Sequence, residues 1–262
     1  MKINNLENNL KNLKRYGLVG IKQSLEDEGA GFEDIRLMRK ITNKLKLNLN
    51  VKIGGCEAKN DIFFCDEIKV NGIVAPMVES KYALKKFINT IEENISTKKI
   101  KFFFNLETIQ AYKNFFSILN SKEFNLLSGI VVGRSDLAGS LSLSKNKVNS
   151  KKIYKIVNTI ASKIKKKNIS IKMGGSITPK SLPFIKKLHL SKKLFIIETR
   201  NCEFKLNKNL LSNFENILID VFKFEIAWLE FKNLNINKKR SSKYFDSIKR
   251  IKEMKKRLKN YL

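Results

Sequence analysis

Residues Gly129–Ser140 read GIVVGRSDLAGS, and this stretch joins a buried strand directly to a charged turn. Its first residues are apolar or small, which is typical of a strand covered on both faces. Arg134, Ser135 and Asp136 follow without a polar run-up. The ends of parallel strands meet at one rim of a sheet, so we expect Arg134 and Asp136 to point into a shared pocket.

The alternation of a short apolar run with a longer amphipathic one repeats along the chain. Unbroken apolar runs predict a parallel sheet covered on both faces. The predicted strands are 18–25, 50–55, 72–78, 101–107, 127–136, 169–176 and 193–201. The predicted helices between them are 32–47, 59–68, 80–94, 108–120, 150–167 and 178–188.

Seven strand–helix units before residue 204 favour an α/β fold, a (β/α)8 TIM-type barrel with one strand unrecognised. We expect the eighth strand near the N-terminus, where residues 3–15 look helical. The alternative architecture is an open doubly wound sheet. We divide the chain into a barrel, residues 1–206, and a C-terminal helical extension, residues 207–262.

Composition limits the classes of function. The 262 residues carry a net charge of +29, which is typical of proteins that bind nucleic acid or anionic surfaces. The lysines are dispersed as pairs and triplets, however, and Lys, Asn, Ile and Phe are frequent throughout. We therefore favour compositional drift over nucleic-acid binding. With three cysteines lacking metal-ligand spacing, no 18-residue apolar run and no signal-like start, we expect a cytoplasmic protein and no membrane partner.

Charged groups cluster where the predicted strands end. Because the loops converge at this rim of a barrel, these positions are the candidate site. The candidates are Lys22 in the first strand with Glu26 and Glu28 after it, Lys52 in the second, Glu107 at the end of the fourth, Gly133, Arg134, Ser135 and Asp136 at the end of the fifth, Lys172 in the sixth, and Glu198 and Arg200 at the end of the seventh.

Glu107 and Asp136 end neighbouring strands and could approach one cation. Mg²⁺ takes oxygen ligands and keeps positions for water or substrate, and it polarises a bound carbonyl. The alternative is that each carboxylate caps the helix or turn that follows it. The sequence leaves both interpretations open.

The segments GIVAPMVES, FNLET and GIVVGRSDLAGSL, in this order, resemble the aldolase/citrate lyase family of the phosphoenolpyruvate/pyruvate superfamily. The resemblance extends over roughly Val19 to Asn201. It implies a modified TIM barrel that makes or breaks a carbon–carbon bond next to an enolate. By the same resemblance, Glu107 and Asp136 would hold the metal, and Gly133 to Asp136 would bind the oxo-acid carboxylate through backbone N–H groups. Lys52 stands where the family usually has arginine.

Two departures from the family change the expected chemistry. The family's histidine base after the first strand is absent, and His189, the only histidine, stands at the end of a predicted helix. Glu26 or Glu28 is therefore the candidate general base. Lysine at position 52 keeps the charge but loses the planar fork that binds a carboxylate at two points.

Three lysines inside strands leave a second mechanism open. A desolvated lysine has a lowered pKa and can form a Schiff base with a carbonyl substrate. Lys22, Lys52 and Lys172 are the candidates, and Lys52 and Lys172 each precede a glycine pair, in VKIGG and IKMGG.

The C-terminal extension predicts a long helix over residues 209–234 with two apolar stripes. One barrel wall needs only one stripe, so we expect the second to pack on a neighbouring subunit, giving at least a dimer. The alternative is a helix folded between the barrel and a final helix, residues 241–262.

These observations favour a metal-dependent carbon–carbon lyase, of the aldolase or citrate lyase type. We expect Mg²⁺, with Mn²⁺ as the alternative. The expected substrate is a 2-oxo or hydroxy carboxylic acid, with phosphorylated, sugar-derived and CoA thioester forms left open. Arg134 and Arg200 are expected to bind the substrate's distal anion and Ser135 to donate a hydrogen bond, while Lys22, Lys172 and Glu198 complete the pocket. The alternative class is a non-catalytic basic barrel that binds nucleic acid or anionic surfaces.

Overall fold

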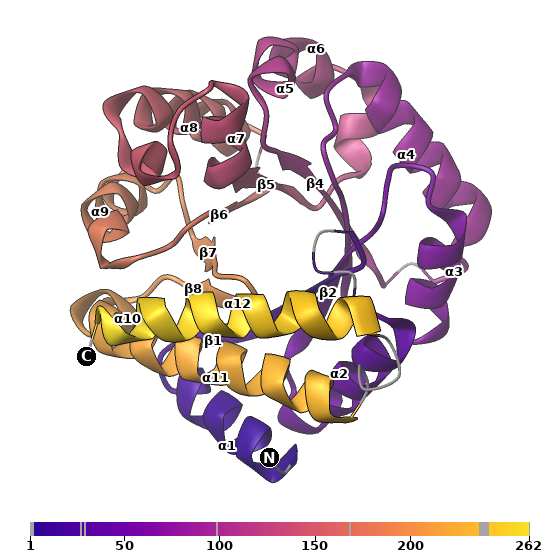
Figure 1. Ribbon diagram of the computed structural model, residues 1–262. Coiled ribbons are helices and arrows are strands. Elements are labelled where there is room, and N and C mark those ends of the chain that lie inside the picture. The colour runs from indigo at the N-terminus through magenta and orange to yellow at the C-terminus, as the bar shows by residue number, and fades with distance from the viewer. Residues whose placement is uncertain are drawn as a thin grey trace.

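A computed structural model describes residues 3–26, 28, 30–97, 99–167, 169–235 and 241–261 (Figure 1). Eight strands close into one barrel in chain order. They are β1 (Leu18–Ser24), β2 (Asn48–Lys52), β3 (Gly72–Ala75), β4 (Lys101–Leu106), β5 (Gly129–Gly133), β6 (Ser170–Gly174), β7 (Ile196–Glu198) and β8 (Cys202–Lys205). The predicted TIM-type barrel is confirmed, and the open sheet is excluded.

Helices surround the barrel, as Figure 1 shows. The α-helices are α1 (Ile3–Lys14), α2 (Phe32–Leu45), α3 (Lys59–Glu67), α4 (Lys81–Asn94), α5 (Ile109–Lys113), α6 (Phe115–Leu119), α7 (Arg134–Ser140), α8 (Lys151–Lys165), α9 (Leu182–Leu190), α10 (Lys208–Ser212), α11 (Phe214–Asn235) and α12 (Ser241–Lys259). Short 3₁₀ turns are η1 (Lys122–Leu126), η2 (Lys145–Asn149) and η3 (Pro179–Ser181).

The eighth strand is not where we expected it. The N-terminal segment is helix α1, and the missing strand is β8, directly after β7. Strand β8 pairs antiparallel with both β7 and β1, so the sheet is mixed and not wholly parallel. Only three residues separate β7 from β8, too few for the helical crossover that a parallel connection needs. A tight turn therefore closes the barrel at its upper rim.

Three local predictions also differ from the structure. The single helix expected over 108–120 is two short helices, α5 and α6. The strand expected over 127–136 ends at Gly133, and residues from Arg134 onward form α7. The long C-terminal helix breaks at Asn213, which ends α10.

The interior of the barrel has an apolar part and a charged part. Val74, Phe103 and Val131, from neighbouring strands β3 to β5, form a small apolar cluster separate from the main core. Strands β2 and β6–β8 contribute buried polar side chains, and β1 contributes a partly buried one: Asn50, Lys52, Lys172, Glu198 and Glu203, and Lys22. The main hydrophobic core lies outside this ring, between the strands and the helices. A barrel with this interior has charged groups fixed below its mouth.

The C-terminal helices cover the lower part of the barrel in the view of Figure 1. Helix α11 packs against α1 and α12. Val221, Phe224 and Trp228 of one apolar stripe are fully buried, and Phe222, Ile226 and Leu229 of the other are buried as well. The chain itself therefore covers both stripes, which is the alternative we considered. The expected oligomer stays a prediction, without support from the stripes.

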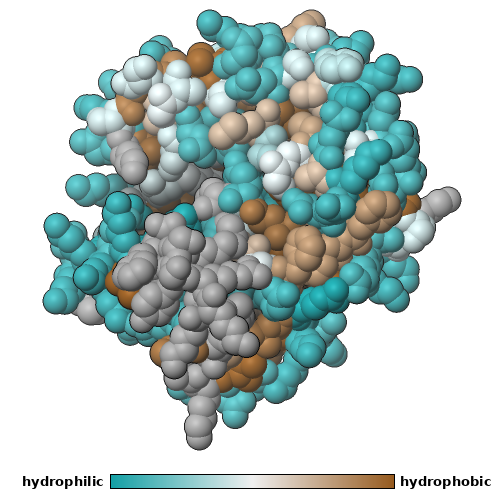
Figure 2. Space-filling view, turned by 45° about the vertical axis from the view of Figure 1, so that its right-hand side comes forward, coloured by the Kyte–Doolittle hydropathy of each residue, from teal (hydrophilic) through white to brown (hydrophobic). Residues whose placement is uncertain are grey.

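The surface agrees with the high content of charged residues. Hydrophilic side chains cover most of the face drawn in Figure 2, with smaller hydrophobic patches between them. Among the described residues, no helix combines the length and the apolar character required to span a bilayer.

Candidate active site

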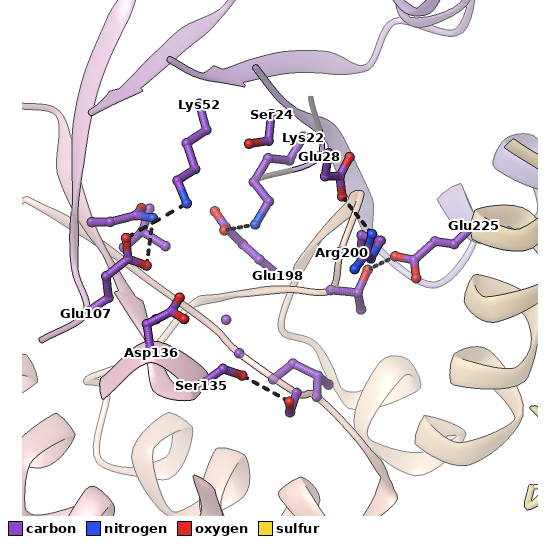
Figure 3. Close-up of a pocket in the computed structure, with 18 of the residues that line it drawn as sticks. Lys22, Ser24, Glu28, Lys52, Glu107, Ser135, Asp136, Glu198, Arg200 and Glu225 are labelled. Atoms are coloured by element: carbon purple, nitrogen blue, oxygen red, sulfur yellow. Dashed lines mark hydrogen bonds and ion pairs between the residues drawn. The ribbon is translucent and has the colours of Figure 1, made fainter. Parts of the chain in front are cut away.

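A cavity of about 430 Å³ opens at the carboxyl ends of the barrel strands (Figure 3). Most of the predicted site residues line it: Lys22, Glu28, Lys52, Glu107, Gly133, Ser135, Asp136, Glu198 and Arg200. Helices α11 and α12 add residues that the sequence analysis did not select, namely Glu225, Arg250, Glu253 and Arg257. The cavity is therefore built by the barrel and the C-terminal extension together.

Glu107 follows β4 and is nearly fully buried, at 2% exposure. Its Oε2 accepts a hydrogen bond from Asn105 Nδ2 at 3.0 Å. Its Oε1 has no hydrogen-bond partner among the described residues. Burial raises the pKa of Glu107, and the neighbouring carboxylate of Asp136 raises it further. The two carboxylates are thus close enough to repel each other across the cavity.

The carboxylates of Glu107 and Asp136 both face the cavity in Figure 3. Asp136 is exposed in the first turn of α7. A side chain at Gly133 would fill the space beside Glu107, because an added Cβ would lie 2.5 Å from Glu107 Oε2. Glycine at this position therefore leaves the glutamate room at the mouth.

The capping alternative does not account for Glu107. The side chain of Thr108 caps α5, accepting a hydrogen bond from the N–H of Ala111 at 3.1 Å. Helix α7 begins after Gly133 without a side-chain cap. The function of Glu107 must therefore be sought in the cavity.

These two carboxylates fit a hard divalent cation. No group of three or more His, Cys, Asp or Glu side chains with metal-site geometry occurs among the described residues. A cation held by two carboxylates would keep its other positions for water and substrate oxygens, which suits Mg²⁺. The buried Oε1 of Glu107, which accepts no hydrogen bond, is the observation that makes this fit.

Lys52 lies beside Glu107. Its Nζ lies 2.5 Å from Glu26 Oε2 and 3.9 Å from Glu107 Oε1. A cation at Glu107 would therefore leave the ammonium with Glu26 as its partner. Glu26 does not line the cavity, whereas Glu28 does.

Arg134 does not lie where we expected a substrate ligand. Its side chain is fully buried and outside the cavity lining. The guanidinium donates to the carbonyls of Gly174 and Gly175 at 3.1 and 2.8 Å and to Asn149 Oδ1 at 2.6 Å, and it lies over the ring of Phe184. Its donors are used in joining β5 to β6, so the geometry argues against direct contact with substrate.

Ser135 and Gly133 form one wall of the cavity. Ser135 Oγ lies 3.0 Å from Ser176 Oγ. Gly175, at φ +84°, approaches so closely that an added Cβ would be 2.4 Å from the nitrogen of Ser135. The first N–H groups of α7 lack partners within the helix, as at any helix start. They provide donors at this wall for an anionic group.

A buried chain of charges lies beneath the cavity. Glu198 accepts from Lys22 at 3.2 Å, and Lys172 donates to both oxygens of Glu203 at 2.9 Å and lies 3.6 Å from Glu198. Lys172 is outside the upper cavity and lines a smaller one, of about 200 Å³, at the opposite end of the barrel. We therefore assign Lys172 a structural role beneath the site.

The pKa values in this chain disfavour a neutral amine. Burial lowers the pKa of Lys22, but Glu198, Glu28 and Glu203 together raise it above its ordinary value. Burial raises the pKa of Glu198, whereas Lys22 and Lys172 bring it below its ordinary value. Because a Schiff base needs an unprotonated amine, this environment argues against Lys22 as a nucleophile.

The turn between β7 and β8 is held from two sides. Glu28 lies 3.6 Å from Arg200 and accepts from Asn201 Nδ2 at 3.2 Å. On the other side, Glu225 Oε1 accepts from Thr199 Oγ1 at 2.7 Å and from the N–H of Asn201 at 2.9 Å. Glu225 is buried on α11. The signal for it was an acidic residue between Phe224 and Ile226, inside an apolar stretch.

His189 is remote from this site. It lies in α9, with Nδ1 3.0 Å from the carbonyl oxygen of Leu194 and its ring against Phe195. It does not line the cavity. Proton transfer at the mouth therefore needs a group other than histidine.

Residues 50–174 match the model of the HpcH/HpaI aldolase/citrate lyase family. The resemblance to this family is confirmed. The match includes the three quoted segments and is shorter than the range Val19 to Asn201 that we expected. It indicates a lyase. No curated protein matches the chain.

Solved structures of this family share the fold. An HpcH/HpaI aldolase from Desulfitobacterium hafniense DCB-2 has a TM-score of 0.59 at 11% identity, covering 85% of this chain and 90% of its own. A family protein from Burkholderia cenocepacia J2315 has 0.58 at 10%, covering 74% and 84%. Citrate synthase SbnG has 0.56 at 14%, covering 74% and 89%. At these identities the likeness concerns the fold.

Proposed function

We propose that the protein is a divalent-metal-dependent carbon–carbon lyase that acts on a 2-oxo or hydroxy carboxylic acid through its enolate. The observation that carries the proposal is the buried Oε1 of Glu107, which accepts no hydrogen bond, in a cavity that the carboxylate of Asp136 also lines. The two side chains would hold Mg²⁺, with Mn²⁺ as the alternative. A bound cation would supply the positive charge that polarises the substrate carbonyl.

The wall of the cavity would orient the substrate. Backbone N–H groups from Gly133 to Asp136 would donate to its carboxylate, because the first turn of α7 leaves them without helical partners. Ser135 Oγ would add a hydrogen bond. Lys52 would offset the negative charge that develops on the substrate oxygen.

Glu28 is our candidate for the general base, because it lines the cavity and Glu26 does not. Its carboxylate would take the proton of the substrate hydroxyl while the adjacent carbon–carbon bond breaks. The electron pair of that bond would move to the carbon next to the carbonyl, which later takes up a proton. Arg200 and Asn201 would hold the carboxylate of Glu28 in place.

Calorimetric titration of the whole protein tests the proposal. We expect Mg²⁺ or Mn²⁺ to bind once per chain, and oxalate, which resembles the enolate of pyruvate, to bind only with metal present. Glu107→Gln should abolish both signals without loss of fold. Oxalate binding that survives EDTA, together with a borohydride-trapped adduct of pyruvate, would instead support a lysine aldolase.

The high positive charge leaves the non-catalytic basic barrel as the competing class. Salt-sensitive binding of nucleic acid, with no response to metal or small acids, would favour it. The charged cavity at the rim is what supports the enzyme over this alternative.

A further inference from the structure

One long stretch of the chain is basic without interruption. Residues 137–197 carry 15 lysines and no aspartate, glutamate or arginine. With 24 carboxylates in 262 residues, a stretch of 61 residues would hold about six of them (61 × 24/262). Compositional drift raises the lysine content of the whole chain, but it does not by itself remove every carboxylate from one sector. This stretch includes η2, α8, β6, η3 and α9, which follow one another around the barrel.

The fold gathers many of these lysines on one surface. Helices α8 and α9 lie side by side on the outside of the barrel (Figure 1). Lys165 Nζ donates to the carbonyl of Ser191 at 3.4 Å, and Lys193 Nζ donates to Asn158 Oδ1 at 2.8 Å. The ends of the two helices are therefore in contact. We define the lysine face as the exposed side chains at and just after these ends: Lys163, Lys165, Lys166, Lys167 and Lys192, with Leu190 and Phe195.

The lysine face lies at the end of the barrel opposite the mouth. Helix α8 leads into the start of β6, and α9 leads into the start of β7. The cavity, in contrast, opens where the strands end. A ligand on the lysine face would therefore leave the cavity open, and the inference drawn from this face does not depend on the proposed function.

The surroundings of the lysine face do not neutralise it. Within the described residues, the lysine of this stretch that forms ion pairs is Lys172, which is buried. Strand β8, which pairs with β7, adds the exposed Lys205. On the other side, Lys122 of η1 is exposed, whereas the carboxylate beside it, Glu123, is buried. A helix dipole favours cations in the last turn of a helix, but it does not exclude carboxylates from the loops that follow.

Two apolar side chains lie exposed among these lysines. Leu190 is 81% exposed and Phe195 is 48% exposed. Proteins that lie on a bilayer combine lysines, which attract anionic lipids, with apolar side chains that enter the headgroup region. The phosphates of a nucleic acid would attract the lysines but gain nothing from an aliphatic side chain. The absence of arginine, which is the preferred residue for recognition of nucleic acids, favours the bilayer as well.

A second copy of the chain does not fit this face. A symmetric dimer brings the same patch of both subunits together, and here it would bring lysines against lysines. We propose that the lysine face binds the surface of a bilayer that contains anionic lipids. The lysines would supply the attraction, and Leu190 and Phe195 would enter the headgroup region. The protein would lie on the bilayer with the mouth of the barrel turned towards the solvent.

Co-sedimentation of the whole protein with lipid vesicles tests the inference. Vesicles of phosphatidylcholine and phosphatidylglycerol in equal amounts are compared with vesicles of phosphatidylcholine alone. We expect binding to the anionic vesicles only, and this binding should weaken as salt is added, because salt screens the surface potential. No binding to the anionic vesicles at low salt, or equal binding to both kinds, would overturn the inference.

Matched triple variants separate the lysine face from the net charge of the chain. K166Q/K167Q/K192Q should weaken vesicle binding at least about 10-fold, since each lysine near an anionic surface contributes a factor of about 5. K81Q/K85Q/K113Q removes the same charge from exposed positions of α4 and α5. It should change binding by no more than about 2-fold, because distant charges are screened. Equal losses in the two variants would show general attraction and reject the lysine face.

Leu190→Ser tests the bilayer against nucleic acid, because it keeps every charge and alters an exposed side chain. We expect vesicle binding to weaken about 5-fold or more, as burial of a leucine side chain permits. Unchanged vesicle binding would contradict the proposal. Tighter binding of a single-stranded RNA than of vesicles, lost in K166Q/K167Q/K192Q and unchanged in Leu190→Ser, would assign the lysine face to nucleic acid instead.

Binding of Mg²⁺ and oxalate distinguishes this inference from the proposed function. Both K166Q/K167Q/K192Q and Leu190→Ser should bind these ligands as the unaltered protein does, because the lysine face is remote from the mouth. Vesicle binding by a protein that takes up neither Mg²⁺ nor oxalate would retain the lysine face and reject the lyase. Binding of both ligands without binding of anionic vesicles would retain the lyase and reject the lysine face.

Discussion

At the scale of single residues, Glu107 combines burial, a neighbouring carboxylate and an oxygen that accepts no hydrogen bond. Glu107→Gln keeps the volume and removes the charge. We expect affinity for Mn²⁺ to fall about 100-fold or more, as happens when groups of a metal site are altered. Without metal, the variant should be more stable at neutral pH, with a Tm about 2–4 °C higher per kcal/mol gained. A lower Tm without metal would contradict this account.

The pH dependence of the metal-free protein follows from the same group. The pKa of Glu107 is raised above its unfolded value by burial and by Asp136. Its contribution to stability is therefore complete below the unfolded pKa of about 4.3 and is lost as pH rises through the raised, folded pKa. The stability advantage of Glu107→Gln should grow over this interval. Urea denaturation at several pH values measures it, and a constant difference would contradict the raised pKa.

Glu225 allows a test of position rather than charge, because one of its oxygens accepts both hydrogen bonds from the β7–β8 turn. Glu225→Gln keeps a carbonyl oxygen that can accept both, whereas Glu225→Leu keeps none. For the leucine variant we expect kcat to fall about 10-fold or more while KM changes little, because Arg200 and Glu28 lose their common support. The glutamine variant should retain most activity. Equal losses in both variants would show that the charge matters.

At the scale of elements, the close approach of the β6 loop to α7 fixes the wall of the cavity. Gly175→Ala places a Cβ at φ +84° and 2.4 Å from the nitrogen of Ser135. We expect the free energy of unfolding to fall by about 2 kcal/mol or more, and oxalate binding to weaken.

Gly139→Ala is the control, since nothing lies within 4 Å of its added Cβ in α7. It should be neutral or stabilise by about 0.5–1 kcal/mol in denaturant unfolding. Equal tolerance of both changes would refute the argument.

Periodicity predicted most elements but not the closure of the barrel. Strands β1 to β7 are recognisable in the sequence as apolar runs. Ser80 and Thr108 are recognisable as the residues that cap α4 and α5. Strand β8 has only four residues, CEFK, of which two are charged, so no apolar run reveals it. Lys205 is exposed, and Glu203 is explained only by the interior, where it meets Lys172 and Asn50. That contact joins segments far apart in sequence, which local patterns do not encode.

The sequence predicted the candidate site only in part. Glu107, Asp136 and Glu28 were selected because they stand where strands end, and all three line one cavity. It also selected Arg134, because sequence does not tell an arginine that faces the mouth from one that turns back to carbonyls behind it. The cavity-lining residues of α11 and α12 were missed, because the periodicity of a helix does not show which part of the barrel the helix will pack against.

At the scale of the whole molecule, the charged barrel interior is a network whose members depend on one another. Lys172→Met would leave Glu203 and Glu198 buried together without their shared cation, and we expect a loss of about 3–5 kcal/mol. K172M/E203Q removes both partners and should recover most of that stability. Urea unfolding of the single and double variants measures the coupling. Additive losses would show that the two side chains act independently.

The reversed direction of β8 has a consequence for how the chain is made. Until residue 205 has been synthesised, neither β1 nor β7 has its last neighbour, and two open edges of backbone donors and acceptors remain available to other chains. A nascent or truncated chain that ends before Cys202 is therefore the form most exposed to aggregation. Barrel closure has to wait for β8, because it is the last of the described strands to be translated.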